Sequence, residues 1–424
     1  MNGNASKTHS SRAGGLDPTF GDNGMVVLSA PGFDQMRAYG VTSDARDDTV
    51  YVSGSCIRTG KDENSAFVMK LRADGSVDAT FGNGGLSLVT PSIGAEALHV
   101  HVQPNGNILV HLTMSVKDSI VHALAMVESH GVPDETFGND GLAVLDMEFH
   151  ALIHATVTPL EDGRILVVGK RQHKQNAKIE GVILRLLANG QWDMTLNRGG
   201  ILPLSSFPGQ VDEENVQCGH AQGHAFVVAG QYAGMLLVRR YFDDGSIDGA
   251  FGLDGDFAIP INAESGHTAV GSLDDLIPAD DGAFIVIGMN AVPEQGYELH
   301  GFLAGVDSTG KPDRTFNGGE ILYTTAAVGP SRLKTGGFDG EGRFIAVGTR
   351  GGLLSDGILI GRYLASGALD TSFGELDGFV FFNDPTHTEI RRGFAMQGDR
   401  GILVSGQISG LDGSRAVVMR FVNT

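Results

Sequence analysis

The sequence predicts an all-β protein, a seven-bladed β-propeller with four antiparallel strands in each blade. The first observation is a short phrase, Asp-x-Thr-Phe with small variations, whose aromatic residue or leucine stands at positions 20, 81, 137, 196, 251, 316 and 373. These positions lie 55 to 65 residues apart, which indicates one repeated unit rather than independent domains. The second observation is that short β-rich runs follow each copy without helical periodicity.

The unit at 76–131 shows the strand plan most clearly. Its four β-rich segments are 86–90, 98–102, 108–112 and 122–127. An Asn-Gly pair at 105–106 separates the second segment from the third, and such a pair between two β-rich runs predicts a tight hairpin. Units of four antiparallel strands that repeat radially are typical of β-propellers.

A unit of this size cannot bury its own hydrophobic face, so we expect a single propeller over 15–424, preceded by a disordered polar tail at 1–14. The approximate blade limits are 15–75, 76–131, 132–190, 191–245, 246–310, 311–367 and 368–424. The last β-rich run, 417–421, ends where other units continue into the phrase. We therefore expect the first copy of the phrase to lie beside this run and to close the ring.

Composition limits the partners and the compartment. The chain has 50 acidic and 30 basic side chains and a net charge of -20, which repels phosphate backbones and anionic lipid, so we expect no nucleic-acid partner. No apolar run approaches the roughly 18 residues of a membrane span, and we expect no membrane insertion. Cys56 and Cys218 are too few for a disulfide framework. Without the apolar core of a signal peptide at its start, the chain is expected in the cytoplasm or on a non-classical export route.

The repeated unit resembles a known family. The pattern Leu-Asp-x-Thr-Phe-Gly-x-x-Gly, followed by a hairpin and a strand that ends in Val-x-Gly, is similar to the bacterial delta-60 repeat, a β-propeller domain of unknown function. The resemblance covers the chain from Gly15 to its end, although Leu196 replaces Phe and Ala250 replaces Thr in single copies. It implies the propeller fold and no particular activity.

The repeated residues are expected to be structural. Asp and Thr side chains can bond backbone groups one to three residues further on, and the aromatic side chain can fill the seam between blades. A ring of carboxylates that binds metal is the alternative interpretation. The residues of this structural motif are Asp17, Phe20, Asp78, Phe81, Asp134, Phe137, Asp193, Asp248, Phe251, Asp313, Phe316, Asp370 and Phe373.

Basic residues recur in one register of the last strand before each phrase, where we expect them to pair with these Asp residues or with backbone carbonyls. They are Lys70, Arg185, Arg240, Arg362 and Arg420, with Met126 and Gly305 as exceptions.

The segments directly after the phrase are expected to be the inner strands that line the channel. They are apolar and end in a polar residue, so these ends would form a ring at one channel mouth. The ring consists of Ser29, Thr90, Asp146, Ser205, Thr325 and Asn383. It offers a place for a small polar ligand or ion, and the alternative is that the strands become polar where they meet water. Because Asp146 is its only ionisable member, we expect no metal site, no cofactor and no catalytic residue.

Histidine gathers in two neighbouring units, at positions 99, 101, 111, 122, 130, 150 and 154. Side chains alternate along a strand, so we expect His99 and His101 on one face of their hairpin and His111 on the other. A metal site would require His150 and His154 to approach across a blade seam. The alternative is a set of partly buried, hydrogen-bonded histidines.

The loops opposite the phrase vary widely in length, and variable loops on a rigid scaffold commonly carry recognition. One of them holds a basic run that is conspicuous in an acidic protein and would suit an acidic partner, unless it is simply solvated. Its candidate binding residues are Lys170, Arg171, His173, Lys174 and Lys178.

These observations favour a non-enzymatic binding or scaffold propeller that recognises a protein or another macromolecule through its variable loops. A glycan is less favoured, because sugar sites use aromatic platforms and the chain has 1 Trp and 7 Tyr. The alternative is a hydrolase- or lyase-type propeller with a small polar or metal site at the channel mouth.

Overall fold

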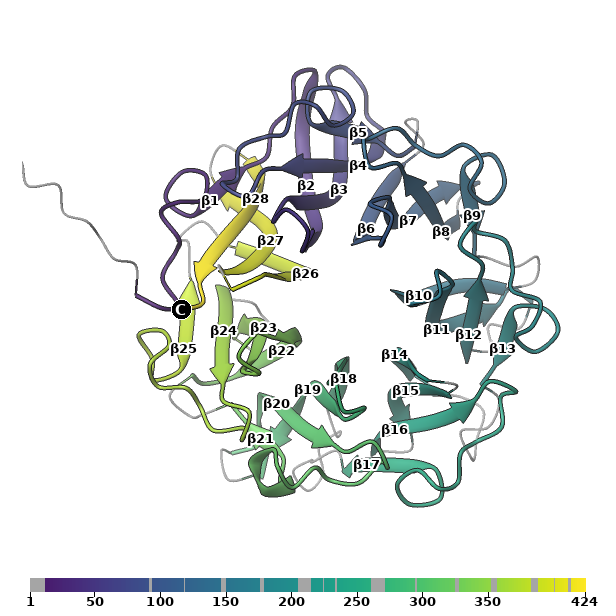
Figure 1. Ribbon diagram of the computed structural model, residues 1–424, viewed down its shortest axis with the longest axis vertical. Coiled ribbons are helices and arrows are strands. Elements are labelled where there is room, and N and C mark those ends of the chain that lie inside the picture. The colour runs from purple at the N-terminus through teal and green to yellow at the C-terminus, as the bar shows by residue number, and fades with distance from the viewer. Residues whose placement is uncertain are drawn as a thin grey trace, which may run out of the picture.

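The fold was analysed in a computed structural model of the protein. The structure describes residues 12–90, 94–117, 119–145, 150–175, 179–204, 215–223, 225–232, 235–260, 271–293, 296–324, 328–351, 357–382, 388–399, 401–410 and 413–424. These residues form seven antiparallel sheets of four strands each, arranged in a ring around a central axis (Figure 1). The predicted seven-bladed β-propeller is confirmed.

Each sheet runs from the axis to the periphery. The strands next to the axis are β2 (Phe33–Ser43), β6 (Ala95–Val102), β10 (His150–Pro159), β14 (Asn215–Gln222), β18 (Gly271–Pro278), β22 (Ser331–Phe338) and β26 (Thr388–Gln397). The second strands are β3 (Val50–Arg58), β7 (Ile108–Val116), β11 (Ile165–His173), β15 (Ala225–Tyr232), β19 (Phe284–Val292), β23 (Phe344–Arg350) and β27 (Gly401–Gly410).

The outer half of each sheet is built from one long and one short strand. The third strands are β4 (Asn64–Leu71), β8 (Ser119–Val127), β12 (Ile179–Leu186), β16 (Met235–Phe242), β20 (Glu298–Val306), β24 (Gly357–Tyr363) and β28 (Gly413–Val422). The outermost strands are β5 (Leu86–Leu88), β9 (Leu142–Val144), β13 (Ile201–Pro203), β17 (Asp256–Pro260), β21 (Leu322–Tyr323), β25 (Phe379–Phe382) and β1 (Met25–Val27). Within the described ranges a short 3-10 helix, η2 (Asn317–Gly319), lies before β21, and no helix there is long and apolar enough to cross a membrane.

The radial order corrects one prediction. The short strands after the phrase are outermost, so the expectation that they line the channel is wrong. The backbone explains the order, because the phrase folds back on the third strand of its own blade: the amide of Asp78 donates to the carbonyl of Lys70 at 2.9 Å. The phrase therefore lies inside a blade and not between two blades. The blade limits shift accordingly, since the first sheet runs from β2 to β5 and not over 15–75.

The ring closes through strands from both ends of the chain. Strand β1 pairs with β28, with Met25 opposite Met419, and Leu16 forms a further bridge with Phe421. The start of the chain thus supplies the outermost strand of the last blade, as the missing phrase predicted. The amide of Gly14 also donates to the carbonyl of Val422 at 2.7 Å. The predicted tail at 1–14 is therefore too long by residues 12–14, and residues 1–11 lie outside the described part.

The hydrophobic core lies mainly between neighbouring blades. One cluster combines Phe20 and Leu403 of the last blade with Met36 and Phe67 of the first, and all four are buried. Burial of each such side chain contributes roughly 1.5–3 kcal/mol, so every blade depends on its neighbours. A register shift interrupts the pairing of the innermost with the second strand in each of the seven sheets. Bulges of this kind increase local twist, which suits strands crowded around an axis.

Candidate functional site

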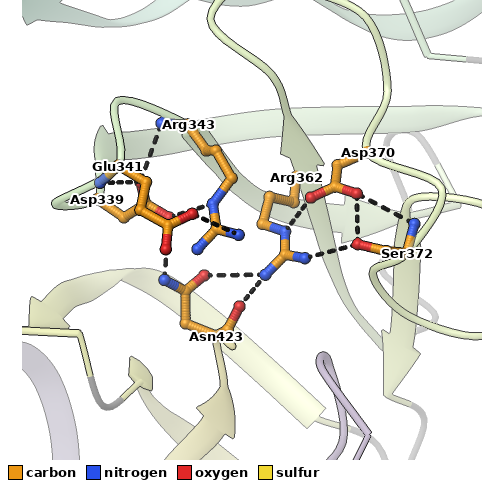
Figure 2. A network of polar contacts seen from close by, with 7 residues as sticks. All are labelled: Asp339, Glu341, Arg343, Arg362, Asp370, Ser372 and Asn423. Carbon is orange, nitrogen blue, oxygen red and sulfur yellow. Dashed lines mark hydrogen bonds and ion pairs between the residues drawn. The ribbon is translucent and has the colours of Figure 1, made fainter.

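The repeated phrase forms the same hydrogen-bonded turn in each blade. In the blade of Figure 2, Oδ1 of Asp370 accepts the backbone amide of Ser372 at 3.1 Å and its hydroxyl at 2.5 Å. Nε of Arg362 donates to Oδ2 of the same aspartate at 2.8 Å. The guanidinium carbon of Arg362 lies 4.6 Å from the centre of the Phe373 ring, which is fully buried. The carboxylate, the arginine and the aromatic ring therefore act as one structural unit.

The same pairing recurs in the other blades that carry a basic residue. The nitrogen to oxygen distances are 3.5 Å for Lys70 and Asp78, 2.7 Å for Arg185 and Asp193, 2.7 Å for Arg240 and Asp248, and 2.9 Å for Arg420 and Asp17. Burial alone would raise the pKa of Asp193, but hydrogen bonds from Thr195 and the charge of Arg185 lower it to about 2. The aromatic residue or leucine of each phrase, here called the wedge residue, is buried in all seven copies. The wedge residues are Phe20, Phe81, Phe137, Leu196, Phe251, Phe316 and Phe373. The described residues contain no group of three metal-binding side chains.

The basic side chains also join one blade to the next. Arg420 donates to the carbonyl of Ala73 at 2.6 Å, and Arg240 donates to the carbonyl of Ser308 at 2.7 Å. In Figure 2, Arg362 donates to the backbone carbonyl of Asn423, whose amide donates to Asp339 at 3.0 Å. The end of the chain is therefore tied to the preceding blade, and this face of the molecule is held by internal bonds.

The axial channel contains a second kind of site. A cavity of about 330 Å³ is lined by residues from the innermost strands of all seven blades. Its polar lining consists of Thr42, His99, His101, Thr156, Thr158, His220, Asp275 and Thr335. The hydroxyl of Thr335 donates to Oδ2 of Asp275 at 2.8 Å, and the amide of Leu276 donates to Oδ1 at 2.9 Å. The carboxylate is thus fixed by two neighbouring strands.

Two of the channel histidines, His101 and His220, are held in their neutral form. The pKa of His101 is lowered to about 4, mainly by burial and also by the proximity of His220, while a hydrogen bond to the backbone of Val157 acts in the opposite direction. Burial also lowers the pKa of His220, although the charge of Asp275 opposes this effect. Neutral imidazoles both donate and accept hydrogen bonds, so the lining offers acceptors next to a carboxylate.

A row of stacked histidines leads outward from the channel. His99 stacks on His111 with ring centres 5.8 Å apart, and Nε2 of His111 lies 2.9 Å from Nδ1 of His122. The prediction that His99 and His111 lie on opposite faces is wrong. The turn at 103–107 sets Val102 opposite Ile108, and the unbroken register from there brings His99 directly opposite His111; directly paired residues share a face. The side chains of His150 and His154 lie outside the described part.

Of the ring predicted at the channel mouth, the two described residues do not lie at the channel. Ser29 and Thr90 follow the outermost strands β1 and β5, where Ser29 is exposed and Thr90 is buried. Asp146, Ser205, Thr325 and Asn383 lie outside the described residues. The physical reason is the reversed radial order, which places the ends of β1 and β5 at the periphery. Sequence reasoning missed the channel residues themselves, although the alternation of His or Thr with Val in 99–102 and 156–158 was a visible signal.

The basic run lies mostly on a strand and not in a loop. Lys170, Arg171 and His173 belong to β11, while Lys174 is exposed just after it and Lys178 lies outside the described residues. Nε of Arg171 donates to Oε1 of Glu180 at 2.8 Å, and His173 lies 3.2 Å from the same oxygen. Arg171 is buried, so its charge is neutralised within the sheet. The run therefore presents much less positive charge to a partner than its sequence indicates.

The family described as "Domain of unknown function (DUF5122) beta-propeller" matches residues 160–196. The match is to a β-propeller family without an assigned function. It extends from the turn before β11 to the phrase residue Leu196. No curated protein matches the sequence.

Solved structures with a similar chain path include several propellers. The β-propeller domain of the Trilobed protease from Pyrococcus furiosus has a TM-score of 0.49 and 9% identity over 92% of this chain and 96% of that chain. Prolyl oligopeptidase B from Galerina marginata has a TM-score of 0.49 and 11% identity over 92% of this chain and 49% of that chain. The alpha-L-arabinanase of Penicillium chrysogenum complexed with arabinobiose has a TM-score of 0.47 and 10% identity over 76% and 92% of the two chains.

Proposed function

We propose that this propeller is a non-enzymatic binding or scaffold module that recognises a protein or another macromolecule through its variable-loop face. The contrast between its two faces carries the proposal. The phrases and the turns between first and second strands lie on one face, and those turns hold two to six residues, as at 223–224 and 44–49. On the other face, the connections between blades are longer on average and hold five to eleven residues, as at 28–32 and 204–214.

The two faces differ in what their residues are available to do. The phrase residues bond to one another and to the next blade, as Arg420 does with Asp17 and Ala73. These bonds hold the ring together, so the phrase residues are engaged within the protein. The connections that differ between blades lie on the opposite face. Variable connections on a rigid scaffold are the usual carriers of recognition.

We also assign the repeated unit to the bacterial delta-60 type. Support comes from the phrase itself, which occurs seven times with the same turn and buried wedge, and from the match of 160–196 to a β-propeller family of unknown function. This assignment adds no activity to the proposal.

A site-specific crosslinking experiment tests which face is used. A photo-crosslinking residue replaces Asp62 or Gln175, two exposed positions on the variable-loop face, and Glu161 serves as the control at the other end of β11. With extract of the source cells, we expect one crosslinked species of defined mass from the first two positions and none from Glu161. The same species from Glu161, or no species from either loop position, would overturn the proposal.

A hydrolase or lyase is the second candidate, and the polar lining of the axial cavity favours it. His101, His220 and Asp275 are side chains of the types that activate water or bind metal. Elemental analysis of the purified protein, together with its thermal stability in chelator, separates the candidates. About one tightly bound metal ion per chain would favour the enzyme, and metal-free protein of unchanged stability would favour the binding module.

A further inference from the structure

The axial cavity has the size of a small-molecule site. Its volume of about 330 Å³ is at the lower end of the range for ligand pockets, and all seven blades contribute to its wall. The contributing strands are fixed by their sheets and by bonds between blades, such as that of Thr335 on β22 to Asp275 on β18. A cavity of this kind is preformed rather than assembled on binding.

The cavity wall carries one side chain with a negative charge. Asp275 is the only Asp or Glu among its described lining residues, and these include no Lys or Arg. The nearby His220 is held neutral by burial. A carboxylate in a pocket whose described lining has no basic side chain attracts a cation by Coulomb interaction. Its two oxygens accept hydrogen bonds from Thr335 and Leu276, and a carboxylate has lone pairs for further donors.

The remaining wall offers hydrogen-bond acceptors and apolar contacts. His101 uses one ring nitrogen toward the backbone of Val157, so its neutral ring presents a lone pair on the other nitrogen. Thr42 and Thr158 add hydroxyl groups, and Ile277 and Phe394 add apolar surface. Such a wall matches a ligand with several donors on a short carbon frame, and it offers little to an anion.

We propose that the axial cavity binds a small organic cation, a primary amine with hydroxyl or second amine groups, whose ammonium is held by Asp275. The further donors of the ligand bond the imidazole of His101 and the threonine hydroxyls, and its carbon frame lies against Phe394 and Ile277. The site is separate from the variable-loop face, so the two proposals stand or fall independently.

Titration calorimetry with defined probes tests the site. The probes are ethanolamine and putrescine, with acetate and erythritol as the anionic and neutral controls, at concentrations up to about 10 mM to cover a millimolar Kd. We expect saturable binding of at least one amine, no binding of acetate, and recovery of the amine unchanged. Failure of both amines to bind, or preferential binding of acetate, would overturn the proposal.

Two matched variants assign the binding to the cavity. Asp275→Asn removes the charge with little change in shape and is expected to weaken amine binding at least tenfold, whereas Asp280→Asn, on an exposed turn after the same strand, should leave it unchanged. Equal binding by both variants would show that the amine binds elsewhere and would overturn the proposal. If Asp275→Asn does not fold, Thr335→Val removes a fixing hydrogen bond from the carboxylate and is expected to weaken amine binding; unchanged affinity of this variant would then overturn the proposal.

Discussion

Individual residues of the phrase combine several stabilising contacts in a small volume. Asp193 accepts two bonds from Thr195 through one oxygen and pairs with Arg185 through the other. The wedge that follows, here Leu196, is fully buried. A charged pair at the protein surface contributes little, but a pair that is buried and hydrogen-bonded is costly to break. The phrase therefore recurs because each of its side chains is needed for the same turn.

Truncating a wedge side chain should be strongly destabilising. Phe137 is 1% exposed, so Phe137→Ala is expected to lower the free energy of unfolding by about 3–5 kcal/mol through lost burial and an unfilled cavity. Phe137→Leu should cost clearly less, because Leu196 occupies the equivalent place in the next blade. Denaturant unfolding measures both values. A loss below about 1 kcal/mol for the alanine variant would contradict the wedge role.

The depressed pKa of Asp193 gives stability a defined pH dependence. Its pKa is about 2 in the folded protein and 3.8 when unperturbed, so its contribution is present above about pH 4 and is lost as the pH falls toward 2. The shift corresponds to on the order of 2 kcal/mol. The stability difference between wild type and Asp193→Asn should therefore shrink over this range. Denaturant unfolding at pH 7, 4 and 2.5 measures it, and a difference that stays constant would contradict the assignment.

Single elements show which parts of the fold the sequence can predict. Strands such as β7, and hairpins such as the one at 105–106, follow from β-rich runs and turn residues, because these features are local. The radial order of strands is not local, since a short apolar run fits either the centre or the edge of a blade. The direction of His99 was mispredicted for a related reason: alternation relates residues within one strand, but the face shared across a hairpin depends on the register, which here sets Val102 opposite Ile108 and His99 opposite His111. The candidate channel residues, Asp275 among them, become neighbours only when seven distant strands meet.

Two blades lack the basic residue, and they offer an element-scale test. Met126→Arg places a guanidinium near Asp134 and over Phe137, and we expect it to raise the free energy of unfolding by roughly 1 kcal/mol. Gly305→Arg should instead destabilise the protein, because a Cβ atom there would lie 2.8 Å from Cβ of Phe316. Denaturant unfolding of both variants measures the difference. Destabilisation of the protein by Met126→Arg would show that the arginine register is not transferable between blades.

The whole molecule depends on closure of the ring by its two ends. Removal of residues 12–27 deletes β1 and leaves Arg420 without Asp17, so the edge of β28 becomes exposed. Unpaired edge strands promote association, and we expect this truncated chain to aggregate or to elute as oligomers in size-exclusion chromatography. A truncated chain that stays monomeric with an unchanged free energy of unfolding would contradict the role of the closure.

A circular permutant separates the need for β1 from the need for a particular chain order. Gly14 and Val422 are hydrogen-bonded, so a short linker can join Thr424 to Arg12 while the chain is opened within 204–214, between β13 and β14. Every sheet of this permutant keeps all four strands, and the last blade becomes continuous in sequence. We therefore expect a monomer with the circular dichroism spectrum of the wild type and cooperative unfolding. An unfolded or oligomeric permutant would indicate that noncovalent closure by the two natural ends is itself required, since every strand pair is retained.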